Sequence, residues 1–294
     1  MRKPLELRWL GVAGLELRTP LATLLVDPFL TRPPVHRLFY GRTPPDGALL
    51  RQHIPQADFI LVSHAHYDHL LDAAEVAGYT GAQVYGSAHT GRILEACGLG
   101  AGQVVRVRAG EVLPLPPHPC ARQGAGGTPV PSPLSPGTEW RFSVNVLRGE
   151  HAPIPFARPG RLPARLRYPL RLRDFVLDED FGFLIEAEGT RLLAWHDWRP
   201  GPAPQADVLV TGADIHLGEL GELLDQVQPR LLIPTHWDNF LRPLSKPLKP
   251  FYRPPCPGHP LPERYDPGAV KRWVSRNHPR VKVWVPVLME RVSL

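Results

Sequence analysis

The chain has 294 residues, 43% of them hydrophobic and 21% charged, which is enough apolar material to bury a large core. Its formal net charge of +6 does not by itself indicate a nucleic-acid-binding protein. No segment approaches the roughly 18 continuous apolar residues of a membrane span, and charged side chains interrupt the N-terminal segment where a secretion signal would be apolar. With only three scattered cysteines, no disulfide framework is indicated, so we expect a cytoplasmic protein with no membrane association.

Apolar runs bounded by turn residues alternate between strand-like and helix-like patterns, as is typical of an α/β protein. In the first part of the chain we expect strands over 5–10, 15–18, 21–26 and 59–63, a helix over 70–77, and a helix that Ser87 caps and Gly98 ends. Strands over 104–107 and 139–147 are expected to continue the first sheet. In the second part we expect strands over 181–187, 191–195, 208–211, 231–234 and 281–285, with helices over 217–227 and from Asp266 to about 277.

Proline is concentrated outside these elements. The segments 114–138 and 244–262 are rich in proline and have no periodicity, so we expect irregular surface loops there rather than linkers between domains. The whole chain, 1–294, is therefore expected to form a single domain.

The segment His64-Ala65-His66-Tyr67-Asp68-His69 carries three imidazoles and one carboxylate, directly after an apolar run. Imidazole and carboxylate suit zinc and neighbouring divalent ions, and no cysteine lies nearby to indicate a cysteine-rich site. Alternate residues of an extended loop point the same way, so His64 and His66 are expected to reach one ion, while Asp68 and His69 reach another. A chance cluster of surface histidines is the weaker interpretation.

This HxHxDH pattern resembles that of the metallo-beta-lactamase-fold superfamily of metal-dependent hydrolases. Members supply a third histidine after a later strand, a bridging aspartate after another, and a last histidine near the C-terminal strand. The counterparts here are His151, Asp197 and His236, each at the end of a predicted strand, where a rigid sheet can position a ligand. Taken singly, a histidine after a strand is more often an ordinary loop residue. His118 competes with His151, but it lies in a proline-rich loop with no strand to position it.

The resemblance extends from about residue 5 to residue 245. Segments 5–14, 24–30 and 234–240 are similar to the subgroup that includes ascorbate-6-phosphate lactonase, although Val12 stands where that subgroup often has histidine. It implies a four-layer αββα sandwich, in which two mixed sheets lie face to face with helices outside and the metals at one edge. The residue patterns alone leave open a single doubly wound sheet.

The resemblance also implies a ligand set for two divalent metal ions. His64, His66 and His151 would hold one ion, Asp68, His69 and His236 the other, and Asp197 would bridge them. Zinc is expected, while manganese or iron would accept the same ligands. Two ions roughly 3.5–4 Å apart share a water and lower its pKa, and the resulting hydroxide attacks phosphorus or a carbonyl carbon.

Several polar residues near these ligands have open roles. Asp68 is expected also to orient the nucleophile. His196 is a candidate acid or phosphate contact, with a packing role the alternative. Asp238 is expected to hydrogen-bond a ligand imidazole or to cap a helix.

Six arginines within 158–173 follow His151, in an arginine-rich loop that we place at about 152–173. Arginine binds phosphate and carboxylate through two parallel hydrogen bonds, so one or two of them are expected to contact a small anionic substrate, the rest forming a solvated face. These arginines are Arg158, Arg161, Arg165, Arg167, Arg171 and Arg173. The leading hypothesis is a hydrolase of a phosphoester or lactone of a small anionic metabolite. The alternatives are a nuclease of the same fold, which the lack of an RNA-binding arm disfavours, and a non-hydrolytic metal-binding protein.

Overall fold

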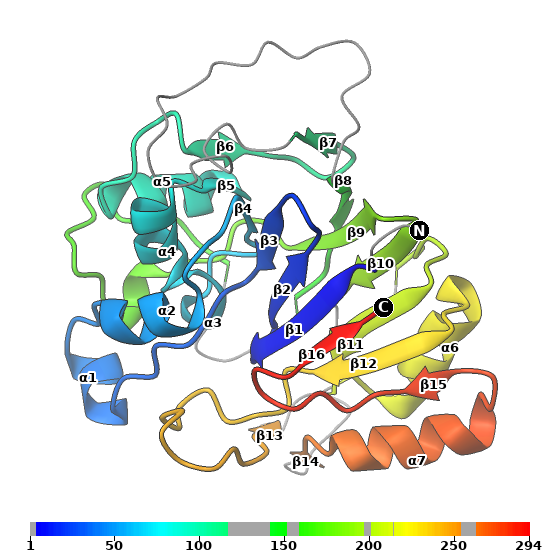
Figure 1. The fold of residues 1–294 in the computed structure, drawn as a ribbon. Helices are drawn as coiled ribbons and strands as arrows, with labels where there is room; N and C mark the ends of the chain where they lie inside the picture. Colours follow the sequence, from blue (N-terminus) through cyan, green and yellow to red (C-terminus); the bar gives the residue numbers. More distant parts are fainter. Residues whose placement is uncertain (1–3, 117–141, 152–158, 197–200, 214, 254–262) are drawn as a thin grey trace.

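Two seven-stranded mixed sheets form the centre of the protein, in a computed structural model that describes residues 4–116, 142–151, 159–196, 201–213, 215–253 and 263–294 (Figure 1). The first sheet has the order β16 (Arg291–Ser293), β1 (Glu6–Gly11), β2 (Gly14–Arg18), β3 (Thr23–Val26), β4 (Phe59–Leu61), β5 (Gln83–Gly86) and β6 (Val104–Arg106). The second has the order β15 (Lys282–Val283), β12 (Leu231–Thr235), β11 (Val208–Gly212), β10 (Thr190–Ala194), β9 (Phe181–Ala187), β8 (Phe142–Arg148) and β7 (Val112–Leu115). In each sheet an antiparallel part continues into a parallel part.

The two sheets pack against each other through alternate residues of their strands. Trp9 of β1 and Phe59 of β4 meet Phe142 of β8 and Phe183 of β9 in one buried cluster. All four side chains are almost completely buried. Because side chains of a strand point to opposite faces in turn, this period of two buries one face of each sheet between the sheets.

Helices cover the two outer faces. On the first sheet, α4 (Ala73–Thr80) and α5 (Ala88–Ala96) pack Val76 and Ile93 in one cluster with Ile60 of β4. On the second sheet, α6 (Leu217–Val227) and α7 (Pro267–Asn277) form a separate cluster, seen at the edge of Figure 1. The shorter helices α1 (Val35–Tyr40), α2 (Gly47–His53) and α3 (Tyr67–Leu70) lie on the side of the first sheet. The expected αββα sandwich is therefore confirmed.

The helix ends follow their local sequence signals. Ser87 accepts a hydrogen bond from the main-chain N–H of Thr90 at the start of α5, and Gly98 after its end has a φ of 97°. Asp266 caps α7 through Gly268 N, with Pro267 in the first helical turn. Helix α6 has the predicted bounds.

Several sequence-based assignments were wrong or incomplete. The predicted strand over 139–147 joins the second sheet, not the first, because β8 pairs antiparallel with β9. The helix expected over 70–77 begins at Ala73, since Leu70 closes the separate turn α3. Within the expected proline-rich loops, Pro114 lies in strand β7, and β13 (Tyr252–Arg253) pairs with β14 (Glu263–Arg264); the rest of 114–138 lies almost entirely outside the described residues. Strands β5 and β16 and helices α1 and α2 were not predicted.

Among the described helices, none is both long enough and apolar enough to cross a membrane.

Candidate metal centre

Six of the seven predicted metal ligands lie together in two groups of three. In the first group, ligand atoms of His64, His66 and His151 lie within 4.8 Å of one another. In the second, the same limit holds for Asp68, His69 and His236. These are the two sets expected for separate ions. Asp197, the expected bridge, and the competing His118 lie outside the described residues.

Strand ends position the members of both groups. Strand β4 is fully buried and ends at Leu61, so residues 63–69 leave the sheet as a loop that turns into α3. His151 comes shortly after β8, and His236 directly follows β12. His236 has a φ of 53°, a left-handed conformation, and its main-chain N–H donates to Val12 O at 2.8 Å. The N-terminal hairpin thus holds the backbone of His236.

A carboxylate outside the predicted set orients His64. The imidazole Nδ1 lies 3.1 Å from Asp180 Oδ1, which favours the tautomer with the proton on Nδ1. Burial, followed by the neighbouring His69, His66, His151 and His236, lowers the pKa of His64 well below its usual value. His64 is therefore neutral, and its Nε2 is free to act as a ligand atom.

His69 has a similar partner. Its Nδ1 lies 2.8 Å from Asp27 Oδ2, and the Asp27 carboxylate is completely buried. The same carboxylate accepts hydrogen bonds from Ser63 N at 2.7 Å and Ser63 Oγ at 2.6 Å. Asp27 therefore fixes both the ring of His69 and the start of the ligand-bearing loop. The sequence analysis missed Asp27 and Asp180; the available signals were that Asp27 directly follows the predicted strand 21–26 and lies in the segment 24–30 that carries the family resemblance.

Asp68 is ionised in this environment. Burial alone would raise its pKa, but the positive potential of His69 and a hydrogen bond from His236 outweigh that effect and hold the pKa well below its usual range. Its Oδ2 lies 3.6 Å from His236 Nε2 and 3.7 Å from His69 Nε2. A carboxylate between two imidazole nitrogens is a suitable donor set for a divalent cation.

The residues present fit a bound metal. His64 Nε2 is buried and has no hydrogen-bond partner among the described residues, an arrangement that costs free energy unless a ligand completes it. It belongs to a cluster of imidazole rings, with centroids 4.6 Å from His66 and 4.7 Å from His151. Neutral imidazoles gathered in this way are the donors that zinc and similar ions take.

His196 borders the second group. Its Nε2 lies 3.0 Å from Thr235 Oγ1, and its ring centroid is 6.2 Å from that of His236. Burial, then His236 and His69, lower its pKa well below the usual value, so the ring is neutral. Whether it contacts substrate stays a prediction.

Both expectations for Asp238 were wrong. No helix begins there, and no ligand imidazole is its partner in the described structure. Instead, Oδ1 accepts the main-chain N–H of Val12 at 2.8 Å, and Oδ2 pairs with Arg32 at 2.6 Å. Arg32, far away in the sequence, was not predicted to have any role.

Four of the six arginines of the predicted loop line one pocket together with Arg42. They are Arg165, Arg167, Arg171 and Arg173. Arg158 lies outside the described residues, and Arg161 is exposed and does not line the pocket.

Comparison with known proteins agrees with this fold and with a metal-dependent hydrolase. Residues 22–142 match the model of the beta-lactamase superfamily domain. A UPF0173 metal-dependent hydrolase of Cupriavidus necator is 37% identical over 240 residues, covering 79% of this chain and 73% of the relative. A second UPF0173 metal-dependent hydrolase, of Cupriavidus taiwanensis, is 39% identical over 115 residues, 38% of this chain and 37% of the relative.

Solved structures share the fold at low sequence identity. Igni18, a metallo hydrolase of Ignicoccus hospitalis, aligns with a TM-score of 0.60 and 16% identity over 99% of both chains. The metallo-beta-lactamase fold protein YhfI of Bacillus subtilis aligns with a TM-score of 0.56 and 12% identity over 100% of both chains.

The αββα sandwich, with imidazole and carboxylate groups gathered where its strands end, defines a metal-dependent hydrolase of the metallo-beta-lactamase superfamily. Within that superfamily, the chain belongs to the UPF0173 metal-dependent hydrolases.

Proposed function

We propose that the protein is a dinuclear hydrolase that cleaves a phosphoester or lactone of a small anionic metabolite in the cytoplasm. The observation that carries the proposal is the division of the six described ligand candidates into two groups of three. His64, His66 and His151 would hold one ion, and Asp68, His69 and His236 the other. Asp197 would complete the set as the bridging carboxylate.

Two divalent ions held there would supply a water with a lowered pKa, suited to act as a nucleophile near neutral pH, and would stabilise negative charge on the substrate. The chain's own residues keep this site in place. Asp27 holds the ring of His69 and Asp180 holds the ring of His64, so the Nε2 atoms of the two imidazoles need little reorganisation to bind a metal ion. Asp68 is ionised and would accept a hydrogen bond from the nucleophile, which would orient the nucleophile.

His196 is the candidate for a contact with the substrate, because it borders the second ligand group. A neutral ring with Nε2 close to Thr235 Oγ1 leaves Nδ1 to hydrogen-bond a phosphate or leaving-group oxygen. Replacing His196 by Ala is expected to lower kcat while the metal content stays unchanged; loss of stability with no separate effect on kcat would indicate the packing role.

Zinc is the metal we propose, since five imidazoles and two carboxylates suit it. Iron and manganese are retained because these ligands accept them too. Among the fold neighbours, CmlA of Streptomyces venezuelae is a diiron beta-hydroxylase by its name, with a TM-score of 0.57 and 16% identity over 100% of this chain and 55% of that one. Elemental analysis of protein purified without added metal gives the identity and the number of ions.

The bridging role is tested with Asp197→Ala. We expect the bound metal to fall to about one ion per chain and the activity to fall with it. Asp266→Ala, which removes a helix cap in α7, is the matched control for loss of a carboxylate. Full metal content with full activity in Asp197→Ala would refute the bridge.

The substrate class is tested by assaying bis(p-nitrophenyl) phosphate, simple lactones and single-stranded RNA side by side. We expect turnover of the phosphodiester or the lactones and none of the RNA. Turnover of RNA alone would support the nuclease, and a metal-loaded protein that hydrolyses none of the three would support the non-hydrolytic alternative.

A further inference from the structure

A second polar site lies apart from the candidate metal ligands. Arg42, after α1, and four arginines of the segment 163–174 line an open pocket of about 370 Å³. This volume is in the usual range for small-molecule sites, about 300–1,000 Å³. The pocket shares no lining residue with either ligand group.

The positive charge of this pocket exceeds the negative charge that the described residues place in it. None of the five guanidinium groups forms an ion pair with any residue that the structure describes, whereas Arg106 and Arg191 are paired with carboxylates elsewhere on the surface. Among the described residues, Asp174 supplies the one carboxylate that lines the pocket, and its Oδ2 accepts the main-chain N–H of Arg171 at 2.8 Å. Because arginine stays protonated, these charges repel one another unless an anion lies between them.

Hydrogen bonds to the main chain hold the segment that carries the arginines. Arg42 Nη1 donates to Arg167 O at 2.5 Å and to Pro169 O at 2.6 Å, and Thr43 N donates to Leu170 O at 2.9 Å. These five residues thus join the turn after α1 to the arginine segment.

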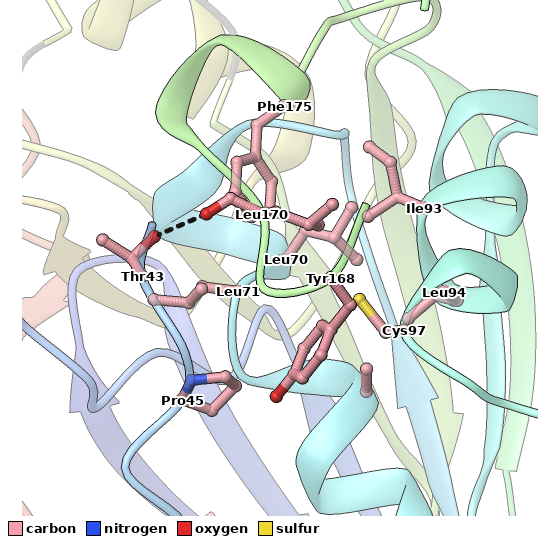
Figure 2. Close-up of a pocket in the computed structure, with 11 residues that line it drawn as sticks. Thr43, Pro45, Leu70, Leu71, Ile93, Leu94, Cys97, Tyr168, Leu170 and Phe175 are labelled. Carbon is pink, nitrogen blue, oxygen red and sulfur yellow. Dashed lines mark hydrogen bonds between the residues drawn. The ribbon is translucent and has the colours of Figure 1, made fainter. Parts of the chain in front are cut away.

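The other side of the segment is packed into the core. Figure 2 shows Leu170 and Phe175 beside Leu70 of α3, with Thr43 hydrogen-bonded to Leu170. Leu170 is 2% exposed and Phe175 6%. The arginines therefore project from an anchored backbone, so less conformational entropy is lost when they bind a ligand. Arg171 adds a further sign of an incomplete site, since its Nε is buried with no hydrogen-bond partner among the described residues.

We propose that this arginine pocket binds a small molecule through one or more phosphate groups. Phosphate presents several acceptor oxygens to planar guanidinium groups, and a multiply charged anion suits five of them beside the single carboxylate of Asp174. A nucleic-acid strand is the less suitable occupant, because none of the described residues that line the pocket is aromatic and able to stack on a base. The site is independent of the proposed hydrolytic function.

Binding of inorganic pyrophosphate, followed by calorimetry, tests the proposal. Arg165 and Arg167 are exposed, so the double variant Arg165→Gln/Arg167→Gln is expected to fold normally. It should weaken pyrophosphate binding by about ten- to a hundredfold, as expected for the loss of charge-assisted hydrogen bonds. Arg18→Gln/Arg108→Gln removes the same charge at exposed positions outside the pocket and should bind as the wild type does. Equal weakening in both double variants would overturn the site.

Chemical modification separates this pocket from binding at the metal centre. Pyrophosphate should protect Arg165, Arg167 and Arg173, but not Arg18 or Arg108, from phenylglyoxal, as mapped by mass spectrometry. Metal content measured before and after each titration shows whether the ions were retained, so failure of the metal centre is distinguishable from failure of the pocket. Unchanged modification at the pocket arginines would refute the proposal. Protection by single-stranded RNA and not by pyrophosphate would reassign the pocket to nucleic acid.

Discussion

Arg32 and Asp238 form an ion pair in which both side chains are 0% exposed and Nη2 lies 2.6 Å from Oδ2. The other oxygen of Asp238 accepts the N–H of Val12, and the carbonyl of Val12 in turn accepts the N–H of His236. Arg32 also donates to Asn239 O at 3.2 Å. The pair therefore ties the loop that carries the last candidate ligand to the N-terminal hairpin.

Replacing Arg32 by Met should destabilise the protein by about 3–5 kcal/mol, because it leaves the Asp238 carboxylate buried without its counter-charge. Urea unfolding gives the free energy of unfolding. The control is Arg51→Met, which breaks a pair with Glu75 whose side chains are 55% and 29% exposed and should cost less than about 1 kcal/mol. Similar losses in the two variants would contradict a structural role for the buried pair.

The Asp27→Asn variant should bind metal about 10- to 100-fold more weakly, because the amide no longer provides a charged acceptor for His69 Nδ1. The amide oxygen still accepts the N–H of Ser63, so the fold should persist. Competition with a chelator measures the affinity. Asp266→Asn, at the start of α7, should leave it unchanged; an Asp27→Asn protein that retains wild-type affinity would show that Asp27 does not support the ligand.

Gly182 lies in β9 under the ring of Trp195, and a Cβ added there would come within 2.7 Å of Trp195 Cε3. Gly182→Ala should therefore destabilise the fold by about 1–3 kcal/mol. Gly78→Ala is the matched comparison, since Gly78 lies in the exposed part of α4 with nothing within 4 Å of the added Cβ, and it should stabilise by up to about 1 kcal/mol. Thermal unfolding of the two variants is expected to shift in opposite directions, and shifts of the same sign would count against this packing argument.

Burial raises the pKa of Asp72 to about 6, against the opposing hydrogen bonds from Thr31 and Leu30. The folded state therefore binds the proton more tightly than the unfolded state does. This contribution stabilises the protein fully below about pH 4 and is lost as the pH rises through about 6, a change of about 2–3 kcal/mol. The difference in unfolding free energy between the wild type and Asp72→Asn should vary over this interval. A difference that is constant from pH 4 to pH 7 would show that Asp72 titrates normally.

The sequence by itself determined the elements whose signals are local. The alternation of apolar residues located most strands, and Ser87 and Asp266 marked helix starts that the structure confirms. The cluster from His64 to His69 is readable for the same reason, since its chemistry lies within one short loop. The resemblance to the metallo-beta-lactamase superfamily then predicted which later residues, His151, Asp197 and His236, join this cluster as ligands.

Only the tertiary structure decided which distant groups meet. Strand β8 has the same alternation whichever sheet it joins, and its pairing with β9 settled the question. Asp27 lies 42 residues from His69, and Arg32 lies 206 residues from Asp238. The residues next to a buried carboxylate in the sequence do not predict its partner. The charge must be paired or hydrogen-bonded, and the folding of the core determines which distant group lies beside it. The arginine pocket likewise depends on tertiary structure, because Arg42 lies far in the sequence from the other four arginines that line it.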